Sequence, residues 1–185
     1  FLGGRCASCR TPISKRYPLV EILTALLFGI VAWRYGWSML TFGGLVFTAM
    51  LLALTFIDAD TQYLPDSLTL PLIWLGLLFN YDGTFVSLQQ AVLGAVFGYM
   101  SLWSLNYIHK LIRGMDGMGG GDFKLLAALG AWMGVSVLPI IVLVAALVGV
   151  IAAVILKAAK SQPIAFGPCL AIAGWLAFAG YEDVR

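Results

Sequence analysis

Long apolar runs separated by short polar breaks organise this sequence of 185 residues. A helix rises ~1.5 Å per residue, so about 20 apolar residues are needed to cross the hydrocarbon core of a bilayer. Irregular backbone cannot face lipid, and such runs are therefore expected to be helical. Apolar runs occupy residues 19–36, 38–57, 67–80, 88–112, 123–134, 135–156 and 163–180. The pattern predicts an all-α, polytopic transmembrane helical bundle with about seven membrane helices.

Glycines and prolines refine this prediction. The third and fifth runs are short, so we expect those helices to be tilted, to thin the bilayer around them, or to be shielded by neighbours. Two glycine pairs with helical spacing suggest close helix packing, although ordinary glycine-rich membrane sequence gives the same pattern: Gly94 with Gly98, and Gly130 with Gly134. Three prolines lie inside or near runs and are expected to kink them: Pro71, Pro139 and Pro168.

Composition supports a membrane protein. Hydrophobic residues make up 61% of the chain and charged residues 11%, and the mean hydropathy is +0.95, far outside the soluble range. The net charge of +2 gives no reason to expect a nucleic-acid partner. Because Phe1 is not a start methionine and no cleavable signal pattern is present, we expect a fragment that lacks its true N-terminus. Residues 1–18 are interpreted as the remnant of a polar cytoplasmic segment, and residues 19–185 as the transmembrane domain.

The basic residues predict an orientation. With seven crossings, the N-terminal segment and the loops at 58–66, 109–122 and 157–162 fall on one side of the membrane. Nine of the eleven lysines and arginines lie on that side, and only Arg34 and Arg185 lie opposite. By the positive-inside rule this side is cytoplasmic.

Two cysteines in the basic N-terminal segment, Cys6 and Cys9, form a Cys-x-x-Cys pair. Such a pair can supply two corners of a tetrahedral zinc site or form a redox couple. We favour half of a zinc site, while two unliganded thiols in a reducing compartment are the alternative.

The candidate chemistry lies in two acids that border apolar runs on the predicted cytoplasmic side. Five glycines in the stretch 114–124 allow the backbone to bend sharply or to approach another chain closely, and Asp122 lies where the next run begins. Asp58 ends the run 45–57 in the same way. Carboxylates at such positions are functional candidates. The sequence offers no usable Ser/His or Cys/His set, so the two aspartates suggest acid–base hydrolysis with one shared proton.

Other reactive side chains have plainer interpretations. His109 lies among polar residues at a helix end and is interpreted as an interfacial histidine rather than a catalyst. Cys169 lies within an apolar run and is expected to be a small buried hydrophobe. Asp66 follows Pro65 and precedes Ser67, which favours a helix N-cap.

Motifs around the two aspartates carry a family resemblance. Gly119-Gly120-Gly121-Asp122 matches the GxGD motif of membrane-embedded aspartyl proteases, and the wider stretch 117–127 resembles the bacterial type IV prepilin peptidases. Further matches are the segments 57–60, 64–66, 16–21 and 166–168. The resemblance covers essentially the whole chain. Its combination of motifs is highly specific, whereas GxGD alone would not be.

The resemblance implies a function and a set of site residues. Asp58 and Asp122 would be the catalytic pair, with an active-site loop of Gly119, Gly120, Gly121 and Lys124. The implied enzyme is an aspartic endopeptidase of the bacterial inner membrane. It would cleave prepilins and pseudopilins at the cytoplasmic face, after the glycine that ends a basic leader, and serve type IV pili or type II secretion. Proteolysis is expected to need no cofactor. Many members also methylate the new N-terminus with S-adenosylmethionine.

Three further acids, Asp60, Asp66 and Asp116, share the catalytic side and are candidate contacts for the basic leader. The family has eight transmembrane helices and two Cys-x-x-Cys pairs, whereas this sequence begins after the first helix and the first pair. Zinc binding by Cys6 and Cys9, and methylation, therefore stay open for this fragment.

Two rival interpretations can be separated by location. A presenilin-like protease would pair GxGD with a Tyr-Asp motif, but Tyr81-Asp82 is predicted on the opposite membrane face. A transporter could use Asp58 and Asp122 as a proton or cation site. Transport acids should lie near the bilayer midplane on broken helices, whereas these two are predicted at helix ends.

Overall fold

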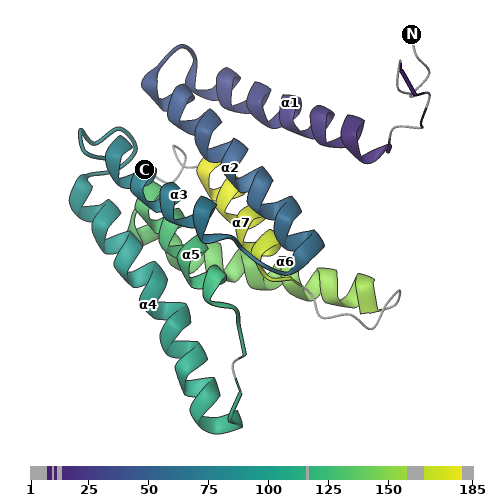
Figure 1. Cartoon of the computed structure of the whole chain (residues 1–185). Coiled ribbons are helices and arrows are strands. Elements are labelled where there is room, and N and C mark those ends of the chain that lie inside the picture. The colour runs from purple at the N-terminus through teal and green to yellow at the C-terminus, as the bar shows by residue number, and fades with distance from the viewer. Residues whose placement is uncertain (1–7, 10, 12–13, 116, 158–164, 181–185) are drawn as a thin grey trace.

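The computed structural model describes residues 8–9, 11, 14–115, 117–157 and 165–180. Regular structure in this part of the chain is helical throughout (Figure 1). The seven α-helices are α1 (Arg16–Tyr35), α2 (Met39–Thr61), α3 (Asp66–Phe79), α4 (Leu88–Arg113), α5 (Gly120–Met133), α6 (Leu138–Lys157) and α7 (Gly167–Ala179), with a short 3-10 helix, η1 (Val135–Val137), before α6. Each predicted apolar run corresponds to one helix, so the predicted helical bundle is confirmed.

Helix lengths divide the bundle into long and short members. Four stretches are long and apolar enough to cross a bilayer: Arg16–Tyr35, Met39–Thr61, Leu88–Arg113 and Val135–Ile155. The helices α3 and α7 are shorter apolar helices, and α5 has only 14 residues. Eleven of those 14 residues are buried. Neighbouring helices therefore shield this short helix, as the sequence suggested.

Helix α5 is the centre of the bundle, in contact with α3, α4 and α7. Its closest approach is to α4, where the backbones of Gly94 and Gly130 touch and a Cβ on either residue would overlap the carbonyl of the other. One turn along, a Cβ on Gly98 would lie 2.6 Å from the carbonyl oxygen of Leu126. The predicted close packing through small residues is confirmed at Gly94, Gly98 and Gly130, where no side chain larger than hydrogen fits between the two helices.

The C-terminal end of α5 is fixed by polar contacts in an otherwise apolar core. Trp132 is fully buried and donates from Nε1 to the carbonyl oxygen of Leu72, at 2.8 Å. The side-chain amide of Asn80 donates to the carbonyls of Ala131 and Trp132, at 2.9 and 3.1 Å. These two carbonyls belong to the last turn of α5, where no intrahelical donor remains. The end of α3 therefore caps α5 at the end remote from Asp122.

The prolines lie at less disruptive positions than expected. Pro71 is inside α3, but Pro139 and Pro168 are the second residues of α6 and α7. The first turn of a helix has no intrahelical acceptor for its N–H groups, so proline costs no hydrogen bond there. The expectation that these two prolines kink their helices is wrong.

Helix α1 is the outermost element, and Val31 is its only buried residue. Its C-terminal end is anchored, because the Tyr35 hydroxyl donates to the carbonyl oxygen of Phe178, at 2.9 Å. From that anchored end α1 diverges from α2 toward Arg16 (Figure 1). Toward Arg16, helix α1 therefore does not cover the adjoining side of α2.

Candidate active site

Asp58 continues the buried face of α2 into the last turn of that helix. Phe47, Leu51 and Leu54 precede it at helical spacing, and all are at most 2% exposed. Asp58 itself is 4% exposed. Its Oδ2 atom is buried and has no hydrogen-bond partner among the residues that the structure describes. A buried carboxylate oxygen without a partner needs an explanation, and a bound water or substrate group would supply one.

Asp122 is the third residue of α5 and is 8% exposed. Gly119 is the N-cap of the helix, with its carbonyl accepting from the Asp122 N–H at 3.2 Å. The first turn of a helix carries unpaired N–H groups and the positive end of the helix dipole, which favour a negative charge. The glycine-rich segment therefore leads directly into a buried helix with an acid at its positive end.

Two glycines bring these helix ends together around Leu64, which lies in the α2–α3 connection. A Cβ on Gly121 would lie 2.6 Å from the Cβ of Leu64. A Cβ on Gly167, the first residue of α7, would lie 3.1 Å from Leu64 Cδ1 and would overlap Oδ2 of Asp58. The carboxylates of Asp58 and Asp122 are close enough to interact electrostatically. The predicted pair is therefore brought together at one end of the bundle.

The convergence of helix ends defines what this site can do. Gly167, at the N-terminus of α7, lies against Asp58, and Asp122 lies in the first turn of α5, so each carboxyl group is next to a helix N-terminus. The unpaired N–H groups of a helix N-terminus stabilise negative charge that develops on an oxygen during acyl transfer. The arrangement fits general acid–base attack of water on a carbonyl group.

The residues predicted as an active-site loop belong mostly to a helix. Gly119 ends the connection as N-cap, but Gly120, Gly121 and Lys124 lie within α5. The Lys124 ammonium pairs with the Asp66 carboxylate at 2.5 Å. Asp66 begins α3 without capping it, since Pro65 is the N-cap and makes no side-chain cap. The N-cap interpretation of Asp66 is wrong, and this acid instead links the first turns of α3 and α5.

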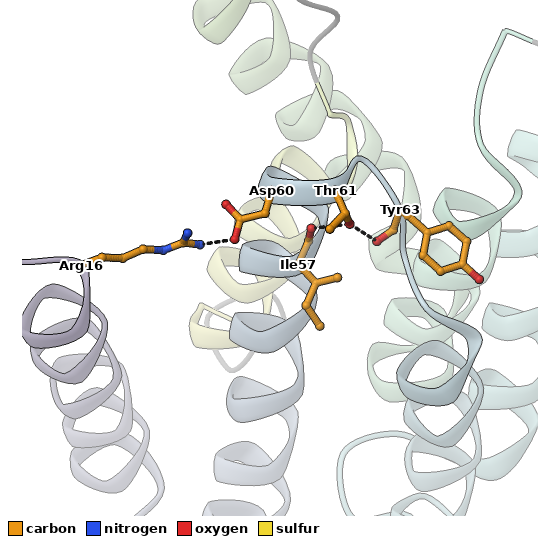
Figure 2. Close-up of polar contacts among 5 residues, drawn as sticks. All are labelled: Arg16, Ile57, Asp60, Thr61 and Tyr63. Atoms are coloured by element: carbon orange, nitrogen blue, oxygen red, sulfur yellow. Dashed lines mark hydrogen bonds and ion pairs between the residues drawn. The ribbon is translucent and has the colours of Figure 1, made fainter. Parts of the chain in front are cut away.

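A second ion pair flanks Asp58. Arg16, at the start of α1, reaches Asp60 at 2.6 Å (Figure 2). Both side chains are about half exposed, at 49% and 51%. Asp60 and Asp66 thus lie at the rim of the site and already hold cations. Asp116, the third candidate leader contact, lies outside the described residues.

The connection before Gly119 is held against α4. The side-chain oxygen of Asn106 accepts from the backbone N–H groups of Gly117 and Met118, at 2.8 and 3.1 Å. Nδ1 of His109 lies 3.2 Å from the Met115 carbonyl oxygen. His109 therefore has a structural contact with the connection that leads to Gly119.

The structure describes Cys169, Cys9 and Asp82 among the remaining predicted residues. Cys169 is buried at 4% exposure, as expected. Cys9 is exposed, with Sγ 3.1 Å from the Thr11 hydroxyl, whereas Cys6 lies outside the described residues. Asp82 follows Asn80, which contacts the C-terminal end of α5, so the Tyr-Asp alternative is at the wrong end for pairing with Asp122.

Sequence reasoning assigned no role to Leu64, Asn106 and Gly167, three residues that shape the site. Leu64 and Gly167 lie in segments that resemble the prepilin peptidases, and that resemblance is the signal that could have identified them. For Asn106 the sequence holds no comparable signal, since its role depends on a contact made only in the folded chain.

Comparisons with known proteins show the family to which this chain is similar. Residues 45–154 match the model of the type IV leader peptidase family, and residues 1–35 match the bacterial peptidase A24 N-terminal domain. No solved structure matches the chain.

Curated relatives match over nearly the entire chain. A prepilin leader peptidase/N-methyltransferase of Neisseria gonorrhoeae is 62% identical over 184 residues, covering 100% of this chain and 64% of the relative. Proteins of the same name from Pseudomonas aeruginosa and Aeromonas hydrophila are 56% and 57% identical, covering 95% and 96% of this chain and 62% of each relative. The chain thus spans slightly less than two thirds of the relatives' length. With its family motifs gathered around two buried aspartates, it belongs to the type IV leader peptidase family.

Proposed function

We propose that this chain carries the proteolytic site of a membrane aspartic endopeptidase that removes the leader from type IV prepilins and pseudopilins. The observation that carries the proposal is the pair Asp58 and Asp122, buried at the ends of two different helices, with one Asp58 oxygen lacking a partner among the described residues. Their place in terminal turns disfavours an ion-transport site, which should lie on broken helices near the midplane.

The reaction follows from two acids sharing one proton. One ionised carboxylate takes a proton from water, and the resulting hydroxide attacks the carbonyl carbon of the scissile peptide bond. The protonated partner donates to the carbonyl oxygen, and the backbone N–H groups at the start of α5 and α7 stabilise negative charge there. The C–N bond then breaks as the leaving amine takes a proton from the acid that accepted it from water. As the carbonyl re-forms, a hydroxyl of the tetrahedral intermediate returns its proton to the other carboxylate, and the pair is back in its starting state. Titration would belong to the pair, not to either residue.

The setting and substrate are proposed from charge and from the names of the relatives. The concentration of basic residues on the predicted side of the catalytic pair supports a site at the cytoplasmic face of a bacterial inner membrane. The substrates are prepilins with a basic leader. Asp60, Asp66 and Asp116 are proposed to attract that leader, and Asp60 and Asp66 would do so by exchanging Arg16 and Lys124 for its cations.

Two cofactors are proposed only for the full-length protein. Methylation of the new N-terminus would use S-adenosylmethionine as methyl donor, in line with the name of the relatives, and no residue of this chain is assigned to that step. Cys6 and Cys9 are proposed as half of a zinc site; the exposure of Cys9 leaves its thiol accessible to a metal. Neither group takes part in the hydrolysis described above.

The direct test uses the full-length protein in bilayers and a prepilin carrying its leader. We expect a single cut after the glycine that ends the leader, identified by the masses of both products. An aspartic mechanism also requires that the cut persist in the presence of chelators and thiol-blocking reagents. No cleavage of any prepilin by a folded, inserted protein would overturn the proposal.

A further inference from the structure

An apolar groove runs between α1, α2 and α7, on the side where α1 diverges from the bundle. It encloses about 450 Å³ and is lined by residues such as Leu23, Leu51, Thr55 and Trp175. The Thr55 hydroxyl donates to the carbonyl oxygen of Leu51 within its own helix, so it presents no free donor to the groove. Any occupant must therefore be apolar along the length of this groove.

The groove leads to the catalytic pair. Thr55 lines it on α2, and Asp58 follows three residues later on the same helix face. Ala171 lines it on α7, and Gly167 precedes that residue by one turn. Because Gly167 lies against Asp58 Oδ2, the seam between α2 and α7 continues from the groove to the acid. A peptide bond held at Asp58 would have this groove as its adjoining apolar surface.

One side chain crosses between α1 and α2 near the end of the groove closest to the catalytic pair. Arg16 spans the gap between α1 and α2 to pair with Asp60 (Figure 2). Its guanidinium also lies 5.5 Å from the ring centroid of Phe56, a residue that lines the groove. An exposed ion pair contributes only ~0–1 kcal/mol, so a competing cation can replace Arg16.

We propose that this groove seats the apolar helical segment of the substrate, which enters sideways from the bilayer between α1 and α2. The Arg16–Asp60 pair opens, and Asp60 takes a cationic residue of the substrate in place of Arg16. This inference rests on the proposed function. The occupant is a peptide helix because the groove residues on α2 (48–56), the catalytic acid Asp58 and the rim acid Asp60 follow one another along that helix. A helix that presents residues at i, i+3, i+4 and i+7 matches such a groove.

The test compares two residues on opposite faces of α1. Leu23 lines the groove, whereas Ala25 is exposed and, two positions along a helix of 3.6 residues per turn, points away from it. In the full-length protein, Leu23→Trp should raise KM for a prepilin by about tenfold, the lower end of what a misfit in an apolar pocket costs, and leave kcat unchanged. Ala25→Trp should behave as wild type. For a shortened substrate without its apolar segment, the two variants should have equal KM values.

Photo-crosslinking gives a second measurement that does not depend on how well the tryptophan variants fold. A photoreactive residue is placed at position 23 or 25 of the inactive Asp122→Asn protein, and a prepilin is added in bilayers. The proposal expects crosslinks to the prepilin from position 23 and only to lipid from position 25.

Crosslinks to lipid alone from both positions, or equal KM values for the two tryptophan variants on the full prepilin, would overturn the groove proposal. Normal cleavage by the wild-type protein would at the same time leave the proposed function intact. If the wild-type protein cleaves no prepilin, the proposed function falls and the groove proposal falls with it.

Discussion

At the scale of single residues, the chemistry depends on two carboxyl groups, one at the C-terminal end of a helix and one at the N-terminal end of another. Asp58 is in the last turn of α2, where the helix dipole is negative, and Asp122 is in the first turn of α5, where it is positive. The two carboxyl groups therefore meet opposite ends of helix dipoles, while the shared proton belongs to the pair and not to either residue. Gly167 at the start of α7 partly offsets the difference, since it brings a second helix N-terminus to Asp58.

Replacing either acid should stop cleavage without preventing insertion. Asp58→Asn and Asp122→Asn each remove one half of the shared-proton pair, and loss of general acid–base catalysis costs about 10²–10⁴ in rate. Initial rates of prepilin cleavage measure the effect, with the amount of folded protein in the membrane as control. Wild-type rates in either variant would remove that aspartate from the mechanism.

The rim acids should affect substrate capture rather than bond cleavage. Asp60→Asn removes a charge that is half exposed, so KM for a basic leader should rise several-fold at most while kcat stays constant. The effect should shrink as salt shortens the Debye length to ~10 Å at 0.1 M. KM is measured for basic and neutralised leaders at several salt concentrations. If Asp60→Asn does not distinguish the two leaders at low salt, the leader is bound elsewhere.

At the scale of elements, two neighbouring glycines at the start of α5 differ in the space available to a side chain. A Cβ on Gly121 would meet Leu64 at 2.6 Å, whereas a Cβ on Gly120 would meet nothing within 4 Å. Gly121→Ala should therefore displace Asp122 and lower kcat strongly, with a packing cost of about 1–3 kcal/mol. Gly120→Ala is the matched control and should keep most activity. Equal kcat values for the two variants would show that the contact with Leu64 does not position the acid.

The connection from α4 to α5 gives a second prediction at this scale. Asn106→Leu removes the acceptor for two backbone N–H groups, so kcat should fall while KM changes little. Asn106→Asp keeps an acceptor oxygen and should restore most of the rate. If both variants lose the same activity, the Asn106 side chain does not act through these two hydrogen bonds.

Sequence reasoning succeeded where information is local. The seven apolar runs predicted seven helices because hydrophobic patterns and breaks are properties of neighbouring residues. Close packing at Gly94, Gly98 and Gly130 was suggested by glycine spacing, but the spacing did not indicate that α4 and α5 pack against each other. The pairing of Asp58 with Asp122 needed a family resemblance, since nothing local joins residues 64 positions apart. The position of Leu64 between Gly121 and Gly167 could not be predicted for the same reason.

At the scale of the whole molecule, the contact between Gly94 and Gly130 holds the bundle around α5. Because each backbone occupies the space that a Cβ would need, Gly94→Ala should separate α4 from α5 and lower the thermal midpoint of the purified protein. Gly149→Ala is a matched control in α6, where the added Cβ would lie 3.8 Å from Cys169 Sγ, an ordinary contact. A similar midpoint for both variants would contradict a tight α4–α5 seam.

The enclosed position of α5 also matters while the chain is being made. Fourteen residues extend about 21 Å at ~1.5 Å each, which is short of the ~30 Å hydrocarbon core. The helix is therefore unsuited to reside in lipid alone. Its partners α3 and α4 are synthesised before it, but α7 follows later, so the nascent helix must be retained by α3 and α4 in the interval. A cell that makes a Gly94 variant should therefore contain less of the protein, because membrane quality-control proteolysis removes part of it during biogenesis.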